Sequence, residues 1–295
     1  MAIDFDERPS QGQPGQRPNP FVGQRRWRRL RMGLATLFSG KPKGYFIPYR
    51  HANSVAAAGT QNSYSALESV FEGQRERFER LLATLGPLPK EPRLARWDQD
   101  WFPPLDAALA YAIVRKRQPE RIVEVGSGHS TRFLAEAIAD ANLRTQLTAI
   151  DPAPRTDISA TGATVIATPV PACGEAPFAD LASGDILFID SSHVLMPGTD
   201  VDFLLNRILP GLPMGSLVHF HDFFLPDDYP AQWAWRNYNE QLGVAALLSG
   251  NAWRVLFASH YAATRMAKAI AASTAGSLRS VSGALPSSLW IQRCS

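Results

Sequence analysis

Side chains that can transfer protons or bind metals follow two apolar runs in the second half of the chain. Asp190 and His193 follow DILFI (185–189), and His221 and Asp222 close the run GSLVHFHD. Histidine titrates near neutral pH, which suits a general base. Imidazole and carboxylate ligands together suit a divalent metal, iron, zinc or manganese rather than magnesium. Two interpretations therefore stand: Asp190, His193 and His221 as catalytic residues, or a metal held by Asp190, His193, His221 and Asp222.

The expected strand geometry of GSLVHFHD affects the choice between acid–base residues and a metal site. His219 and His221 alternate along one strand and therefore share a face, whereas Asp222 would project to the other face if the strand continued. A single metal site containing both His221 and Asp222 therefore requires the strand to end at His221.

A glycine turn upstream predicts a ligand-binding loop. The strand-like run RIVEV (121–125) leads through Gly126, Ser127 and Gly128 into a segment with helical apolar spacing. Glycines let a ligand approach the main chain closely. With Ser130 or Thr131 as the N-cap, free N–H groups at the start of the helix would face that ligand.

The ligand is indicated by two acidic residues rather than by the glycines. The turn lacks the third glycine of the dinucleotide fingerprint, so an ordinary tight turn is the alternative. Glu124 would repel a pyrophosphate but suits a cofactor that carries an amino acid. Asp151 follows Gly128 by about 20 residues, the spacing at which an acid reaches a ribose diol.

An alternation of strands and helices is predicted to position these residues. Strands are expected at 121–125, 146–150, 163–167, 185–189, 215–221, 253–258 and 288–292, and helices at 63–85, 105–117 and 201–208. This order implies right-handed crossovers and a mostly parallel sheet covered on both faces. Ligands of such sheets bind beyond the carboxyl ends of the strands, where the candidate residues lie.

The chain is expected to have three parts. Residues 1–24, rich in Pro, Gly and Gln, read as a disordered tail, residues 25–104 as a helical extension or lid, and residues 105–295 as the sheet domain. The arginine-rich segment 25–38 predicts an amphipathic helix. It would rest on a membrane surface or a partner, pack on its own domain, or join two copies into a homo-oligomer.

Composition narrows the function classes. The net charge is +3, and most of the basic excess precedes residue 44, so a nucleic-acid-binding core is not implied. The two cysteines give no disulfide framework, and no apolar run reaches about 18 residues. A cytoplasmic location is the expectation. Aromatic segments at 44–52, 97–104 and 223–238 would wall a pocket for a small-molecule acceptor.

Four stretches carry a resemblance to a known family. VEVGSGHST, TAIDP, DILFIDSSHV and GSLVHFHDFF resemble the class I S-adenosylmethionine-dependent methyltransferases, in the bacterial small-molecule group allied to the O-methyltransferases. The resemblance covers residues 111 to about 230, and SLWIQ fits the reversed seventh strand of the family. It implies an α/β, Rossmann-like sheet of seven mostly parallel strands with helices on both faces, plus the N-terminal helical extension.

The resemblance also implies residue roles and a reaction. S-adenosylmethionine would be held by seven residues: Glu124, Gly126, Ser127, Gly128, Ser130, Asp151 and Asp190. The methionine end would lie on the glycine loop and the ribose on Asp151. The expected reaction is methylation of a small molecule, at oxygen, by a general base or with a divalent metal. The alternatives are a metal-dependent enzyme with other chemistry and a non-catalytic scaffold subunit.

Overall fold

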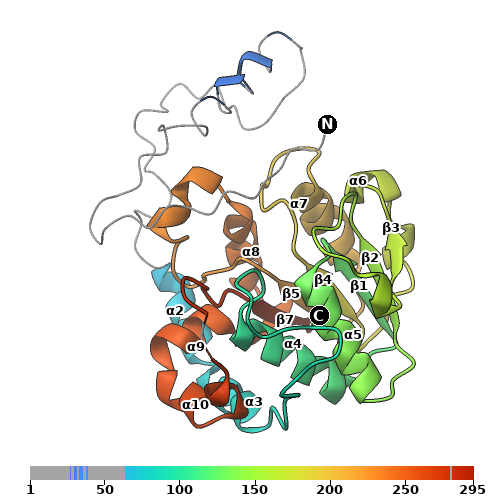
Figure 1. Cartoon of the computed structure of the whole chain (residues 1–295). Helices are drawn as coiled ribbons and strands as arrows, with labels where there is room; N and C mark the ends of the chain where they lie inside the picture. Colours follow the sequence, from blue (N-terminus) through green and yellow to red (C-terminus); the bar gives the residue numbers. More distant parts are fainter. Residues whose placement is uncertain (1–26, 28–29, 32, 36–37, 39–63, 280) are drawn as a thin grey trace. The chain divides into compact units, whose positions relative to one another are not determined.

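The computed structural model describes residues 27, 30–31, 33–35, 38, 64–279 and 281–295 (Figure 1). It divides into two compact units, one of residues 1–61 with 229–237, the other of residues 62–228 with 238–295. The predicted tail 1–24 and most of the segment 25–63 therefore lie outside the described residues. At the described positions between 27 and 38 the chain is helical, and Trp27 and Phe38 are exposed.

The larger unit is built on a seven-stranded sheet in the order β3-β2-β1-β4-β5-β7-β6. Its strands are β1 (Arg121–Val125), β2 (Gln146–Ile150), β3 (Thr164–Ile166), β4 (Ile186–Ile189), β5 (Leu217–Phe220), β6 (Trp253–Ala258) and β7 (Leu289–Arg293). Strands β1 to β5 pair in parallel, whereas β7 is antiparallel to both β5 and β6. The predicted fold class and the reversed last strand are confirmed.

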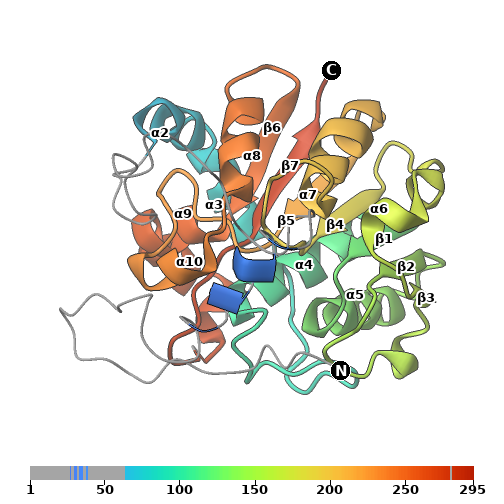
Figure 2. The ribbon, with the colours of Figure 1, turned by 90° about the horizontal axis from the view of Figure 1, so that it is seen from above.

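Helices cover both faces of this sheet. They are α2 (Ser65–Glu72), α3 (Arg75–Ala83), α4 (Pro104–Arg117), α5 (His129–Asp140), α6 (Val170–Cys173), α7 (Asp200–Phe203), α8 (Glu240–Leu248), α9 (Ser259–Arg265) and α10 (Ala267–Ala271). Seen from above, α4 and α5 lie on one side of the sheet and α7 on the other (Figure 2). Helix α4 is buried from Pro104 to Val114, so neighbouring elements, α5 among them, cover the sides that do not face the sheet.

Two predicted helices differ from those observed. The expected helix at 63–85 is broken into α2 and α3 at Gly73 and Gln74, where Gly73 caps α2 and Gln74 leaves helical geometry. Glycine is a poor helix former, which favours a break there. The expected helix at 201–208 begins as α7 and continues as a π-helical turn over Leu204–Ile208.

One hydrophobic core joins α2 and α3 to the sheet. Phe71 and Phe78 are completely buried, and Phe78 packs against Phe257 of β6 and Tyr261 of α9 with ring centroids 5.3 and 5.8 Å apart. Aromatic pairs at such distances add to the stabilisation from burial. In the described part of the chain, no helix has the length and hydropathy needed to cross a bilayer.

Candidate active site

Glu124, near the carboxyl end of β1, is completely buried. Ser130 Oγ donates a hydrogen bond of 2.6 Å to Glu124 Oε1, while Glu124 Oε2 has no partner among the described residues. Burial outweighs the hydrogen bonds from Ser130 and Thr131 and raises the pKa of Glu124 from 4.5 to about 8. A buried carboxyl with one unused oxygen can take a cationic group.

The helix start differs from the expected N-cap. Helix α5 begins at His129 with Gly128 as its N-cap, and the Gly128 N–H donates to Thr131 Oγ1 at 2.9 Å. Neither Ser130 nor Thr131 is the N-cap, because both lie inside the helix and Ser130 is occupied by Glu124. The helix therefore begins two to three residues earlier than predicted.

Gly126 holds the tips of β1 and β4 in direct contact. Its φ of +76° is one that L side chains rarely adopt, and a Cβ there would lie 2.0 Å from the Asp190 carbonyl oxygen. Gly128 is different, because a Cβ would meet only Thr156 Cγ2 at 3.7 Å. Gly126 is thus required by the packing of the fold, and Gly128 leaves open space beside the main chain.

Asp151 follows β2 and is fixed by the glycine loop. Its Oδ2 accepts from the Ser127 N–H at 2.8 Å and from Ser127 Oγ at 3.0 Å, and its Oδ1 accepts from the Ala153 N–H at 2.8 Å. The side chain remains partly exposed. A neighbouring cavity of about 440 Å³ is lined by residues 154–159 and Val165.

The four predicted catalytic or metal-binding residues converge at the tips of β4 and β5. His193 Nε2 lies 3.2 Å from Asp190 Oδ1 and 3.5 Å from Asp222 Oδ2. His221 Nδ1 lies 3.7 Å from Asp190 Oδ1 and 3.4 Å from Asp222 Oδ1. Strand β5 ends at Phe220, and Asp222 has a φ of +58°, so the chain turns before Asp222 can point to the opposite face.

Two carboxylates that the sequence analysis did not single out complete this cluster. Glu240, the first residue of α8, is completely buried, and its Oε2 lies 2.9 Å from His193 Nδ1 and accepts from Ser191 Oγ at 2.9 Å. Asp106 of α4 lies 3.8 Å from His221 Nε2. His193 is therefore held between Glu240 on one ring nitrogen and Asp190 on the other.

These carboxylates determine the charge of the imidazoles. Burial alone would lower the pKa of His193, but its bonds to Asp190 and Glu240 raise it well above 6.5. For His221 burial is likewise outweighed, chiefly by Asp222, and the pKa rises to about 10. Burial disfavours ionised Asp190, yet His193 and His221 hold its pKa well below 3.8. The surrounding carboxylates therefore favour the protonated form of both imidazoles.

His219 is structural. It is completely buried, its ring stacks on Phe188 with centroids 3.7 Å apart, and its Nε2 bonds Ser288 Oγ at 2.8 Å. Burial, with the nearby His221, lowers its pKa well below 6.5. A neutral imidazole in an aromatic stack supports the core of the sheet.

The predicted metal site is not supported. Among the residues described, no group of three or more His, Cys, Asp or Glu side chains is arranged to hold a metal ion. Asp190, His193, His221 and Asp222 instead contact one another as acid–base partners. The geometry favours proton transfer over metal coordination.

One family model and several solved structures are similar to this chain. Residues 123–223 match the family model described as a methyltransferase domain. No curated protein matches the sequence. Among solved structures, the chain is similar to the S-adenosylhomocysteine-bound methyltransferase PaMTH1 of Podospora anserina, at 14% identity and a TM-score of 0.40, over 85% of this chain and 100% of that one. It is also similar to the O-methyltransferase TomG of Streptomyces achromogenes in complex with S-adenosylmethionine, at 15% identity and a TM-score of 0.39, over 93% and 100%.

The matched residues contain the glycine loop, Asp151 and the cluster at Asp190 and His221. They also contain the parallel half of the sheet, which β7 completes by entering antiparallel between β5 and β6. The family match therefore covers about a third of the chain, residues 123–223, and over this stretch the chain resembles a methyltransferase domain.

Proposed function

We propose that the chain methylates an oxygen atom of a small-molecule acceptor, with His193 as the general base. The observation that carries this proposal is the chain of contacts Glu240–His193–Asp190, at the end of the sheet where ligands of such folds bind. Glu240 holds His193 Nδ1, so His193 Nε2 faces the Asp190 side chain, which is 37% exposed. This is the orientation that a base needs towards an acceptor hydroxyl.

The reaction balances without another reactant. The acceptor oxygen forms a bond to the sulfonium methyl carbon, and the carbon–sulfur bond breaks with its electrons going to sulfur. The proton of the acceptor hydroxyl passes to His193 Nε2. Binding of the acceptor between His193 and Asp190 would replace the contact that most raises the pKa of His193. The imidazole can then release its resting proton before it takes the one from the acceptor.

The cofactor is proposed to lie across the tips of β1, β2 and β4. The unused Glu124 Oε2 would take the methionine ammonium group, and the loop from Gly126 to Ser130 would lie against the amino-acid end. Asp151 is pre-oriented by Ser127 to accept from the ribose hydroxyls. Asp190 would border the methyl group. The cavity at residues 154–159 supports a nucleoside on the Asp151 side.

Asp151→Asn tests the position of the ribose. The amide oxygen can still accept from Ser127, but the amide carries no charge and offers fewer acceptors to a diol. The affinity for S-adenosylhomocysteine, measured by calorimetry, is expected to fall about 10- to 100-fold, the loss of one to two charge-assisted hydrogen bonds. Asp180→Asn, at an exposed loop residue, is the control and should leave it unchanged. Equal affinities for S-adenosylhomocysteine in the two variants would show that Asp151 does not bind the ribose.

The raised pKa of Glu124 predicts that binding of the cofactor releases a proton. With a pKa of about 8 this carboxyl is mostly protonated at pH 7, and an adjacent ammonium group favours its ionised form. Binding enthalpies of S-adenosylhomocysteine, measured at pH 7 in buffers of different ionisation enthalpy, should therefore reveal release of up to about one proton. Glu124→Gln should release none. Adenosine, which lacks the amino acid, is the matched ligand control and should release none from the wild type.

The charge state of the cluster predicts activity at alkaline pH. His221 has a pKa of about 10 and that of His193 is also raised, so the cluster loses a proton only as the pH rises above neutrality. At acceptor concentrations below KM, where the rate reports the protein before the acceptor binds, methyl transfer from radiolabelled S-adenosylmethionine to a panel of phenols and hydroxy acids is expected to accelerate from pH 7 to pH 9. A plateau already reached at pH 7 would contradict the charges assigned here. Assays with and without a chelator separate this mechanism from a metal-dependent one.

A further inference from the structure

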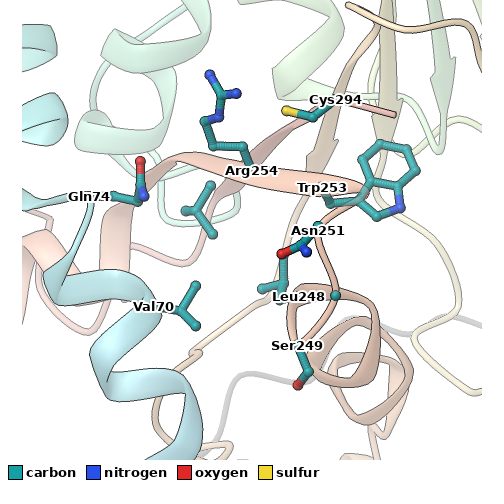
Figure 3. Close-up of a pocket in the computed structure, with 10 residues that line it drawn as sticks. Val70, Gln74, Leu248, Ser249, Asn251, Trp253, Arg254 and Cys294 are labelled. Carbon is teal, nitrogen blue, oxygen red and sulfur yellow. The ribbon is translucent and has the colours of Figure 1, made fainter.

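A cavity at the start of β6 lies at the edge of the sheet opposite the candidate active site. It has a volume of about 310 Å³ and lies between the α2–α3 junction, the end of α8 and the first residues of β6 (Figure 3). Because β5 and β6 are both antiparallel to β7, β6 runs parallel to β5. Trp253 and Arg254 therefore lie at the amino ends of the parallel strands, whereas His221 and Asp222 follow the carboxyl end of β5.

The lining of this cavity is rich in hydrogen-bond donors. Gln74, Asn251 and Arg254 line it from three different parts of the chain, the α2–α3 junction, the loop after α8 and β6 (Figure 3). In the part of the chain that the structure describes, none of these three side chains has a hydrogen-bond partner. Amide and guanidinium groups without partners can donate to a ligand.

Positive charge beside the cavity is uncompensated. On α3, Arg75 and Arg80 form ion pairs with neighbouring glutamates, but no described carboxylate lies within ion-pair distance of Arg77, Arg117 or Arg254. Burial lowers the pKa of Arg77, and repulsion from Arg254, Arg80 and Arg117 lowers it further. Cys294, which also lines the cavity, acts in the opposite direction on Arg77. An anion bound at Arg254 would reduce the repulsion between Arg254 and Arg77.

We propose that this cavity binds a small molecule that carries a phosphate group. Arg254 would hold the phosphate, the Gln74 and Asn251 amides would donate further hydrogen bonds, and Arg77 would supply additional positive charge. The planar guanidinium fork matches phosphate oxygens in a bidentate geometry, and the volume lies at the lower end of the range of small-molecule sites. The site is separate from methyl transfer and does not depend on the proposed reaction.

Calorimetry of the full-length protein with pyrophosphate and with inorganic phosphate, at fixed ionic strength, tests this proposal. The wild type is expected to bind one pyrophosphate per chain, more tightly than inorganic phosphate. Arg254→Gln and Arg77→Gln should each weaken pyrophosphate binding by about tenfold or more, the loss of a charge-assisted contact. Arg144→Gln removes an exposed arginine on a loop far along the chain and should leave binding unchanged. The affinity for S-adenosylhomocysteine should be equal in all four proteins, which shows that they are folded.

Three outcomes would overturn the proposal. One is the absence of saturable pyrophosphate binding to the wild type. The second is pyrophosphate binding that survives both Arg254→Gln and Arg77→Gln, which would place the anion outside this cavity. The third is an equal loss of pyrophosphate affinity in Arg144→Gln, which would show that the anion is attracted by the net charge of the protein and not by a specific site. If the wild type does not bind S-adenosylhomocysteine, that result contradicts the proposed methyl transfer but not the proposed phosphate site.

Discussion

Gly126→Ala is expected to destabilise the protein by about 3 kcal/mol, the sum of an unfavourable backbone conformation and a steric clash. The residue has a φ of +76°, and the new Cβ would lie 2.0 Å from the Asp190 carbonyl oxygen. That oxygen cannot move freely, because the Asp190 N–H donates to the Val125 carbonyl at 2.8 Å and ties β4 to β1. The strain must therefore be taken up by the two central strands.

Gly128→Ala is the matched control. It adds the same methyl group two residues later in the same loop, where the only contact would be Thr156 Cγ2 at 3.7 Å. Denaturant unfolding should show a large loss of stability for Gly126→Ala and less than about 1 kcal/mol for Gly128→Ala, the usual scale of a tolerated substitution. Similar losses in both variants would refute the close contact between the tips of β1 and β4.

The second large effect is expected for His193→Gln. Glutamine can still bond to Glu240, so the buried carboxyl keeps a partner, but it cannot accept a proton from the acceptor. Methyl transfer should fall by about 10²- to 10⁴-fold, the usual contribution of a general base. The affinity for S-adenosylhomocysteine should change little, because His193 is not among the residues proposed to bind it.

His260→Gln is the control for this variant. His260 is also largely buried beside a carboxylate, with its Nε2 2.8 Å from Asp227 Oδ2, but it lies on α9 outside the cluster. Its replacement should leave the rate within a few-fold of the wild type. If both variants kept wild-type rates, His193 would not be the base. If both lost S-adenosylhomocysteine binding, the defect would lie in folding rather than in proton transfer.

The structure of the glycine loop could be predicted because its parts are close in sequence. Glu124, Gly126 and Ser130 lie on consecutive elements, and the contact of Ser130 with Glu124 follows from a strand, a tight turn and a helix. The spacing to Asp151 reflects one βαβ unit, whose geometry is nearly constant. The position of the N-cap was wrong because it depends on the exact end of the turn, and Gly128 takes that place.

The cluster of histidines and carboxylates at the tips of β4 and β5 was predicted only in part. Asp190, His193 and His221 follow strands whose apolar pattern is clear. Glu240 could not be found, because 47 residues separate it from His193 and no local pattern marks it. Asp106 likewise reaches His221 from α4. Such pairs are set by the packing of whole helices on the sheet, which no spacing rule describes.

The sheet was predicted more accurately than the helices on its second half. Each expected strand is present with its ends shifted by at most two residues, because buried strands are continuous apolar runs. Helices α8, α9 and α10 were not predicted. Helix α8 begins with two polar residues and α9 is polar at both ends, but much of their sequence is small and apolar. The helical period is therefore weak, and packing rather than the apolar pattern determines the structure.

The place of β7 in the sheet has a consequence for synthesis of the protein. The strand that separates β5 from β6 is the last of the seven to emerge from the ribosome. While it is still within the exit tunnel, β5 has a free hydrogen-bonding edge and β6 has no neighbour to pair with. Nascent chains at this stage expose unpaired strand edges, which can pair with other chains and which chaperones protect. The sheet therefore cannot be completed until residues 289–293 are available, and these residues act as its closing segment.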